Sequence, residues 1–157
     1  MAAEEKRAER VCAVVVTYNR VELLRECLTA LESQNRPVDH VIVIDNASSD
    51  GTPDVVKGEH PSVELVELPD NRGGAGGFHE GARRAYDGGY DWLWLMDDDT
   101  IPTETALEEL LAAPASMGDL ARPLVLASKV VMTDGLLHPF NISRADDRDP
   151  DRTVVAV

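Results

Sequence analysis

Three consecutive aspartates, Asp97, Asp98 and Asp99, are the side chains in this sequence best suited to chemistry. They directly follow an apolar run, residues 91–96 (DWLWLM). Adjacent carboxylates repel one another, so this arrangement favours a bound cation. Hard oxygen ligands suit Mg²⁺ or Mn²⁺, and proteins usually share such ions with substrate phosphates. The triplet therefore predicts a divalent metal site, with a solvated acidic turn or a helix N-cap as the alternatives.

Polar residues or glycines follow three other apolar runs at the corresponding point. They are Thr17, Tyr18 and Arg20 after residues 11–16 (VCAVVV), Asp45 and Asn46 after 41–44 (VIVI), and Asn71, Arg72, Gly73 and Gly74 after 63–68 (VELVEL). With the triplet they offer an aromatic ring, carboxylates and backbone donors, a set that fits a nucleoside diphosphate held with a metal. The alternatives are a packing role for Tyr18, a solvated strand end for Asp45 and surface charges for the arginines.

The glycine-rich segment 73–77 (GGAGG) does not have the spacing of a dinucleotide-binding loop. It differs from G-x-G-x-x-G, and it follows the third apolar run rather than the first. This argues against a dinucleotide fold. We interpret the glycines as a place where backbone approaches a ligand at a helix N-terminus, and a mobile loop is the alternative.

The apolar runs are predicted to be buried strands that alternate with helices. Asn19 and Glu22 predict a capping box for the first helix, whose apolar face carries Val21, Leu24, Leu28 and Leu31. Further helices are expected to start at Thr52, to run from the glycines to about residue 86, and to span 103–113 before Pro114. A fifth strand is expected over 124–132.

This alternation predicts an α/β fold, a three-layer sandwich with a mostly parallel central sheet. Ligands of such sheets bind beyond the carboxyl ends of the strands. The four groups of polar residues are therefore expected to share one edge of the sheet.

Composition excludes some classes of function. The chain has 157 residues and a formal net charge of -14, which argues against a nucleic-acid partner because such binding depends on Lys and Arg. Cys12 and Cys27 lack metal-ligand spacing and are expected to be reduced core residues. Residues 1–10 do not resemble a signal peptide, and no apolar run reaches the roughly 18 residues of a transmembrane segment. We expect a cytoplasmic protein, with peripheral attachment to the inner face of the membrane as an alternative.

Four segments together resemble the family 2 glycosyltransferases, which have the GT-A fold. They are residues 14–20 (VVVTYNR), 41–52 (VIVIDNASSDGT), 69–77 (PDNRGGAGG) and 92–102 (WLWLMDDDTIP). The resemblance covers about residues 11–131. The motifs NRGGAGGF (residues 71–78) and WLMDDD (residues 94–99) are closest to those of the galactofuranosyltransferase and rhamnosyltransferase branch.

The resemblance implies a role for each matching residue. Thr17, Tyr18 and Asp45 would hold the base and ribose, with Arg20 as a weaker candidate, while Asn71, Arg72, Gly73 and Gly74 would border the ribose and diphosphate. Asp97 to Asp99 match the DxD motif of the family, with Asp97 and Asp99 on the metal and diphosphate and Asp98 on the ribose or sugar.

The implied activity is an inverting transfer from a UDP- or dTDP-linked sugar to a hydroxyl of a saccharide or lipid-linked saccharide, with Mn²⁺ or Mg²⁺. It implies cell-wall or surface polysaccharide synthesis. The base of this family lies well beyond the DxD motif, whereas this chain ends 58 residues after Asp99. We therefore expect a truncated chain, with its catalytic base elsewhere. The expected parts are an extension (1–10), a nucleotide-sugar-binding domain (11–141) and a charged tail (142–157) that starts an acceptor-binding half.

Two other functions compete with this hypothesis. A nucleotidyltransferase also has an α/β sheet and metal-binding acids, but a glycine- and basic-rich loop normally follows its first strand, where this chain has TYNR. A non-catalytic nucleotide-binding module is the other alternative. The oligomeric state is left unassigned.

Overall fold

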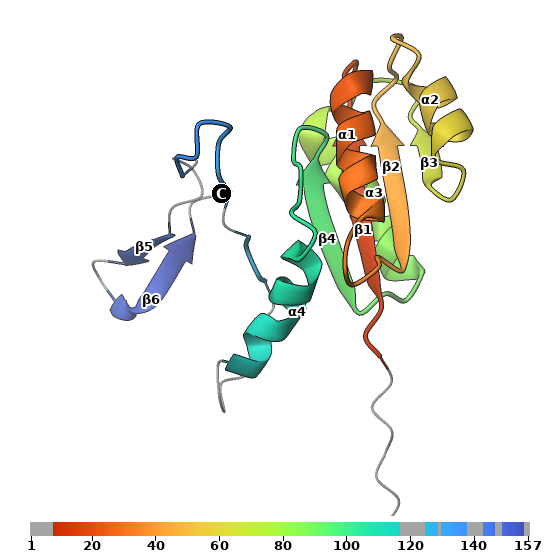
Figure 1. Ribbon diagram of the computed structural model, residues 1–157. Coiled ribbons are helices and arrows are strands. Elements are labelled where there is room, and N and C mark those ends of the chain that lie inside the picture. Colours follow the sequence, from red (N-terminus) through yellow and green to blue (C-terminus); the bar gives the residue numbers. More distant parts are fainter. Residues whose placement is uncertain (1–7, 117–124, 129, 138–142, 147–148, 156–157) are drawn as a thin grey trace, which may run out of the picture. The chain divides into compact units, whose positions relative to one another are not determined.

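The computed structural model describes residues 8–116, 125–128, 130–137, 143–146 and 149–155 (Figure 1). The chain divides into two compact units, residues 1–107 and 108–157. Within the described part, every helix is too short or too polar to cross a membrane.

The first unit is a parallel α/β sandwich (Figure 1). Its elements alternate: β1 (Val11–Thr17), α1 (Val21–Glu32), β2 (His40–Asp45), α2 (Thr52–Glu59), β3 (Glu64–Glu67), α3 (Gly73–Asp87) and β4 (Trp92–Asp97). The strands form a sheet in the order β3-β2-β1-β4, and every pairing is parallel. The predicted fold class is therefore confirmed.

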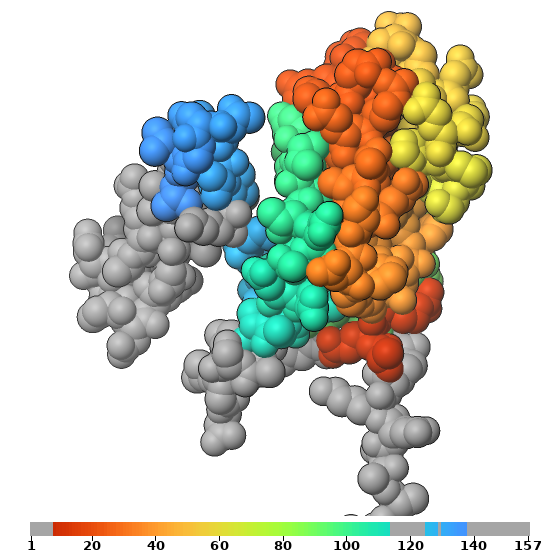
Figure 2. Space-filling view, viewed as in Figure 1, coloured from red at the N-terminus to blue at the C-terminus, as the bar shows by residue number. Residues whose placement is uncertain are grey.

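Strand β1 lies inside this sheet, and helices cover both of its faces. All of its residues are buried, and successive side chains enter opposite cores. Ala13 and Val15 pack with α1 and with Val56 of α2, whereas Val14 packs with Ala85 of α3. A continuous β-branched run suits a strand that is buried on both faces. Helix α1 lies in front of β1 in Figure 1, and its atoms form part of the surface seen in Figure 2.

The start of α1 differs from the prediction. Its Leu24, Leu28 and Leu31 are buried as expected, but Arg20 is the N-cap residue and makes no capping bond. The predicted capping box at Asn19 is wrong, because the Asn19 side chain is used elsewhere. Its Oδ1 accepts the Ser49 backbone N–H at 2.7 Å.

The later helices follow the sequence signals more closely. Helix α2 begins at Thr52 as predicted, with a proline in its first turn, and α3 begins at Gly73 and ends before Gly88. Helix α4 (Ala106–Ser116) starts later than expected, because Thr103 and Ala106 form a turn in which the Ala106 N–H donates to the Thr103 carbonyl at 3.0 Å. It also continues past Pro114, which lies in its last turn, where the missing N–H removes a single helical bond.

The second unit contains an antiparallel hairpin of β5 (Ser143–Asp146) and β6 (Asp149–Val155), which the charged tail did not predict. The fifth strand expected over 124–132 is wrong for the described residues, where Val131 forms only an isolated bridge to Leu137. Residues 124 and 129 lie outside the described part. An apolar run forms a strand only where it is covered, and Val125 here is 83% exposed. The predicted boundaries at residues 10 and 141 stay predictions.

Candidate functional site

The carboxyl ends of the strands bring the predicted polar residues to one edge of the sheet. In the strand register Thr17 pairs with Asp45, and the neighbouring Val16 pairs with Asp97. Thr17, Asp45 and Asp98 are each no more than 3% exposed. Buried carboxylates are costly unless they are paired or bind a ligand. This edge is therefore the candidate site.

The acidic triplet is tied to the end of β1. The Thr17 hydroxyl donates to Asp98 Oδ2 at 2.8 Å. Nη1 of Arg20 donates to Asp98 Oδ1 at 3.3 Å and to Asp99 Oδ2 at 3.0 Å. The charge and hydrogen bond of Asp98, together with Asp99, raise the pKa of Arg20 above its ordinary value, so this guanidinium is a fixed positive charge. The family resemblance implied a place for Arg20 near the base and ribose. In the structure its guanidinium contacts Asp98 and Asp99 instead.

Asp97 differs from its two neighbours. Burial raises the pKa of its carboxyl above the ordinary value, and the charges of Asp99 and Asp98 add to this rise. A raised carboxyl pKa means that the ionised form lacks compensation. A cation beside Asp97 would supply that compensation.

The other side of the site is built around the end of β2. Both oxygens of the buried Asp45 carboxylate lie 3.2 Å from the backbone nitrogen of Ser48. Asn46 is also buried, and its Oδ1 accepts the Arg72 N–H at 3.2 Å. Tyr18 is 46% exposed, so its ring is open to a ligand at the same edge.

The glycines at the start of α3 have two different functions. A Cβ on Gly77 or Gly81 would lie 2.5 Å or 2.2 Å from the side chain of a β1 valine, so these two glycines let the helix pack closely on the sheet. A Cβ on Gly73 or Gly74 would meet nothing within 4 Å. Gly73 also has a φ of +66°, and its N–H donates to Asn71 Oδ1 at 2.8 Å. The first turn of α3 is therefore accessible to an anion, as helix N-termini favour.

Two loops of the site are joined by bonds that the sequence analysis missed. Asn19, at a φ of +53°, donates its N–H to Ser48 Oγ at 2.9 Å and accepts from Ser49. The Asp50 carboxylate accepts N–H groups from the first residues of two helices, Val21 at 2.9 Å and Thr52 at 3.1 Å. The asparagine in TYNR was the available signal, since Asn tolerates positive φ well. We call this pair of connections the loop clasp.

The described residues contain no group of three or more His, Cys, Asp or Glu side chains arranged to hold a metal ion.

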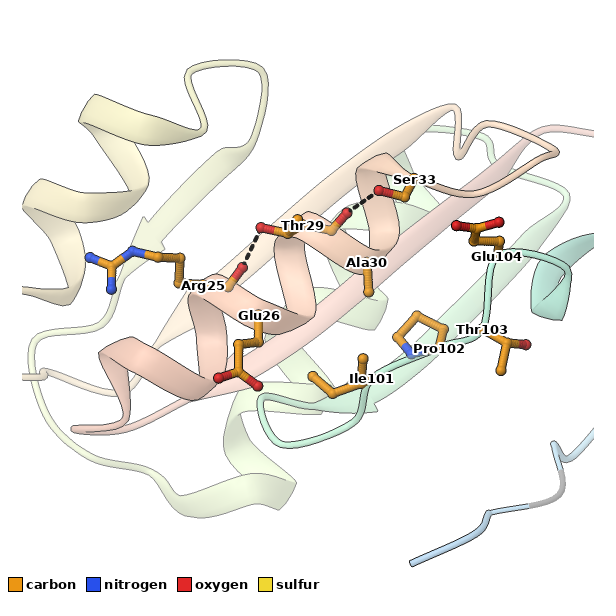
Figure 3. A pocket seen from close by; sticks show the side chains of 9 residues that line it. All are labelled: Arg25, Glu26, Thr29, Ala30, Ser33, Ile101, Pro102, Thr103 and Glu104. Atoms are coloured by element: carbon orange, nitrogen blue, oxygen red, sulfur yellow. Dashed lines mark hydrogen bonds between the residues drawn. The ribbon is translucent and has the colours of Figure 1, made fainter. Parts of the chain in front are cut away.

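The pocket in Figure 3 is a separate feature of about 530 Å³, and none of the predicted site residues lines it. It lies between α1 and the segment after β4 and is lined by Arg25, Glu26, Thr29, Ala30, Ser33, Ile101, Pro102, Thr103 and Glu104.

Comparison with known proteins identifies the family. The model of glycosyl transferase family 2 matches residues 12–118. The chain is 42% identical to galactofuranosyltransferase GlfT1 of Mycolicibacterium smegmatis over 113 residues, which cover 72% of this chain and 37% of that protein. It is 38% identical to GlfT1 of Mycobacterium tuberculosis, with coverage of 72% and 38%. The chain thus spans somewhat more than a third of these relatives.

A solved structure agrees in fold. The mannosyltransferase PcManGT from Pyrobaculum calidifontis, in complex with GDP-Man and Mn²⁺, is 31% identical and superposes with a TM-score of 0.59. The match covers 70% of this chain and 33% of PcManGT. A GT-A fold is therefore shown by the structure as well as by the sequence. The chain belongs to glycosyl transferase family 2, in the galactofuranosyltransferase branch.

Proposed function

We propose that the first unit binds the donor of a metal-dependent, inverting glycosyltransferase. The donor is a nucleotide-diphospho-sugar, and the acceptor is a hydroxyl of a saccharide or lipid-linked saccharide used in cell-wall or surface polysaccharide synthesis. One observation carries this proposal: the buried Asp98 is tied to Thr17 and Arg20 beside Asp97, at the carboxyl edge of the parallel sheet. Such a set of charges at the carboxyl edge suits a ligand that brings its own cation.

The base and ribose bind at the ends of β1 and β2 in this proposal. Within the described part of the chain, the buried Asp45 carboxylate accepts one long backbone N–H bond, from Ser48 at 3.2 Å, so it retains lone pairs for an N–H group of a base. The exposed ring of Tyr18 offers a stacking surface. Thr17 is committed to Asp98, so we assign it to positioning that aspartate beneath the ribose or sugar.

The diphosphate and metal bind between the triplet and α3. Asp97 and Asp99 supply carboxylate oxygens, and the diphosphate and water supply the other ligands, as is usual for Mg²⁺ and Mn²⁺. Two carboxylates without a third protein ligand fit such a shared site. The ion offsets the charge that develops on the leaving diphosphate. The open first turn of α3 at Gly73 and Gly74 lets the diphosphate approach the positive end of the helix, and Asn71 and Arg72 border it. The complex of PcManGT with GDP-Man and Mn²⁺ supports a donor that binds together with a divalent metal.

The described residues are assigned donor binding, not removal of the acceptor proton. That step needs a carboxylate base beside the acceptor, and no described aspartate or glutamate is assigned to it. The proposal for these residues therefore covers donor binding and not the transfer step.

Calorimetric titration tests the proposal. UDP, dTDP and GDP are each titrated into the chain with Mn²⁺ and with chelator, since the similar mannosyltransferase holds a guanosine donor. The Asp97→Ala/Asp99→Ala variant is compared with an Asp54→Ala/Asp87→Ala control, which removes two exposed carboxylates from α2 and α3. We expect one nucleotide to bind only with metal, with an affinity loss of about a hundredfold or more in the first variant, because charge-assisted contacts are lost.

Two results would contradict the proposal. One is a folded wild-type chain that binds none of the three nucleotides. The other is binding that is unchanged by chelator and by loss of the two aspartates. Metal-dependent binding of the free nucleotide without any measurable affinity for its sugar conjugate would instead favour the non-catalytic module.

A further inference from the structure

Arg20 is the positive charge held against the acidic triplet. A single nitrogen, Nη1, reaches both Asp98 and Asp99. Among the described residues, no other basic side chain forms an ion pair with Asp97, Asp98 or Asp99. The residue stands at the N-cap of α1 without a capping bond of its own, so this contact is its main polar interaction.

The two paired aspartates are held to different degrees. The Asp98 side chain is 4% exposed, and Thr17 fixes its second oxygen. The Asp99 side chain is 53% exposed, and Arg20 is the partner that the structure gives it. Asp98 is therefore part of the scaffold, whereas Asp99 can change its partner without disturbing the core.

A divalent cation and Arg20 would make opposing demands on Asp99. The proposed function places the metal on Asp97 and Asp99, but the guanidinium already lies 3.0 Å from the Asp99 carboxylate. Two cations on one carboxylate repel each other at this range. The Arg20 side chain is 52% exposed, so it is free to turn away.

We infer that Arg20 is a built-in counter-cation that competes with the divalent ion for Asp99 and, once displaced, binds the donor diphosphate. This inference rests on the proposed function. An arginine that is free beside a diphosphate is well suited to bind two of its oxygens. The same side chain thus opposes binding of metal alone and supports binding of metal with nucleotide.

The consequence is coupling between the two ligands. Arg20 lowers the affinity of the empty site for metal and raises the affinity of the metal-loaded site for nucleotide. Each ligand then increases the affinity for the other by the same factor, as thermodynamic linkage requires. The site would be loaded with metal mainly when the donor is present.

The experiment measures the two affinities separately. Mn²⁺ alone is titrated by electron paramagnetic resonance of the free ion, and the nucleotide that binds best is titrated by calorimetry at saturating Mn²⁺. The variants are Arg20→Gln and Arg20→Lys, with Arg83→Gln as the matched control. Arg83 is similarly exposed, at 50%, and likewise contacts two carboxylates, but on α3. Thermal melting followed by circular dichroism checks that each variant folds.

The affinities are expected to move in opposite directions. For Arg20→Gln we expect Mn²⁺ alone to bind about fivefold more tightly, the size of effect that an exposed ion pair allows. The nucleotide should bind about tenfold more weakly, because a charge-assisted contact is lost. Arg20→Lys keeps the positive charge, so its affinity for Mn²⁺ alone should be as weak as that of wild type. Arg83→Gln should change neither affinity.

The outcomes separate this inference from the proposed function. If wild type shows no metal-dependent nucleotide binding, the proposed function fails and the inference fails with it. If wild type binds normally but Arg20→Gln leaves the affinity for Mn²⁺ alone unchanged or weaker, the inference alone is overturned. A parallel fall in both affinities would mean that Arg20 only shapes the loop before α1, which also overturns it.

Discussion

Individual carboxylates at the two edges of the same parallel sheet differ in their surroundings, as Glu64 at the amino edge and Asp97 at the carboxyl edge show. At the amino edge, Glu64 lies 2.9 Å from His40 Nε2 and 3.1 Å from Arg84 Nη1. The His40 ring stacks on the Tyr90 ring. The guanidinium of Arg10 also lies over the Tyr90 ring, with its Cζ 4.3 Å from the ring centroid. The hydrogen bond from His40, with help from Arg84 and against partial burial, lowers the pKa of Glu64.

At the carboxyl edge the balance is reversed. Burial and two neighbouring aspartates raise the pKa of Asp97, and the Asp45 carboxylate contacts the backbone N–H of Ser48 at 3.2 Å. Tyr18, next to Thr17, is left exposed. At the amino edge, side chains of the chain itself pair with Glu64, whereas the carboxyl edge is where we propose that the ligand binds.

Gly77→Ala is expected to have the largest effect, because it disturbs the packing beneath the carboxyl edge. Its Cβ would lie 2.5 Å from Val16 Cγ1 and 3.3 Å from Asn46 Nδ2. Such overpacking should cost about 2 kcal/mol of unfolding free energy. Displacing Asn46 would also weaken its bond to Arg72, so nucleotide affinity should fall. Urea denaturation and calorimetry measure the two effects.

Gly58→Ala is the control for this change. It lies inside α2, and its Cβ would meet nothing within 4 Å. Alanine is a better helix former than glycine, so we expect a gain of about 0.5–1 kcal/mol in stability and unchanged nucleotide affinity. If Gly77→Ala had the same effect on stability and nucleotide affinity as Gly58→Ala, the inference that α3 packs closely under this edge would be wrong.

Substitutions of Asn19 test the loop clasp, and they should change nucleotide binding more than they change stability. Asn19→Ala removes the acceptor for Ser49 and places a less tolerant residue at a φ of +53°. We expect about tenfold weaker nucleotide binding, since roughly 1–2 kcal/mol of strain and lost bonding falls on the loops that carry Tyr18 and Asp45. Asn19→Asp keeps the acceptor and should bind almost normally, while Asn19→Gly loses the acceptor for Ser49 but avoids the strain at positive φ and should be intermediate. Equal affinities across the series would show that the clasp does not position the site.

Glu64→Gln is the corresponding change at the amino edge and should leave nucleotide affinity unchanged. Because folding lowers the Glu64 pKa below 4.5, its stabilising effect is present above that pH and is lost as pH falls through the folded value. The side chain is 39% exposed, so we expect a loss of only about 0.5 kcal/mol at pH 7. Urea denaturation from pH 7 to 3 should show the variant and wild type converging. A constant difference across this range would exclude the ionised carboxylate as its source.

Parallel topology explains why so much of the candidate site could be predicted. A buried strand is recognisable from an uninterrupted apolar run, and the carboxyl ends of parallel strands must meet at one edge. The positions of Thr17, Asp45 and Asp97 followed from those two facts alone. The same reasoning placed the glycines before α3 but did not separate Gly73, which faces open space, from Gly77, which packs on the sheet.

Features that depend on loop geometry were not predictable in this way. The side chain of Asn19 had two possible uses, as a helix cap or as a bond to another loop, and no periodic pattern decides between them. The expected fifth strand failed for a related reason. Its apolar residues indicate a preference for burial, but a strand also needs a neighbouring strand. A single sequence does not show whether Val125 and Val131 have one.

The two thiols provide the smallest expected effect and probe the scaffold behind the site. Burial raises the pKa of both Cys12 and Cys27 to about 12, and the charges of Asp98 and Asp99 add to the rise at Cys27. Because the thiolate is the reactive form, iodoacetamide at pH 8 should modify neither cysteine in the folded chain and should leave nucleotide affinity unchanged. In urea both should react, as mass spectrometry would show. Selective modification of Cys27 in the native chain would mean that the region behind the triplet opens, and the rigid placement of Asp98 would then be wrong.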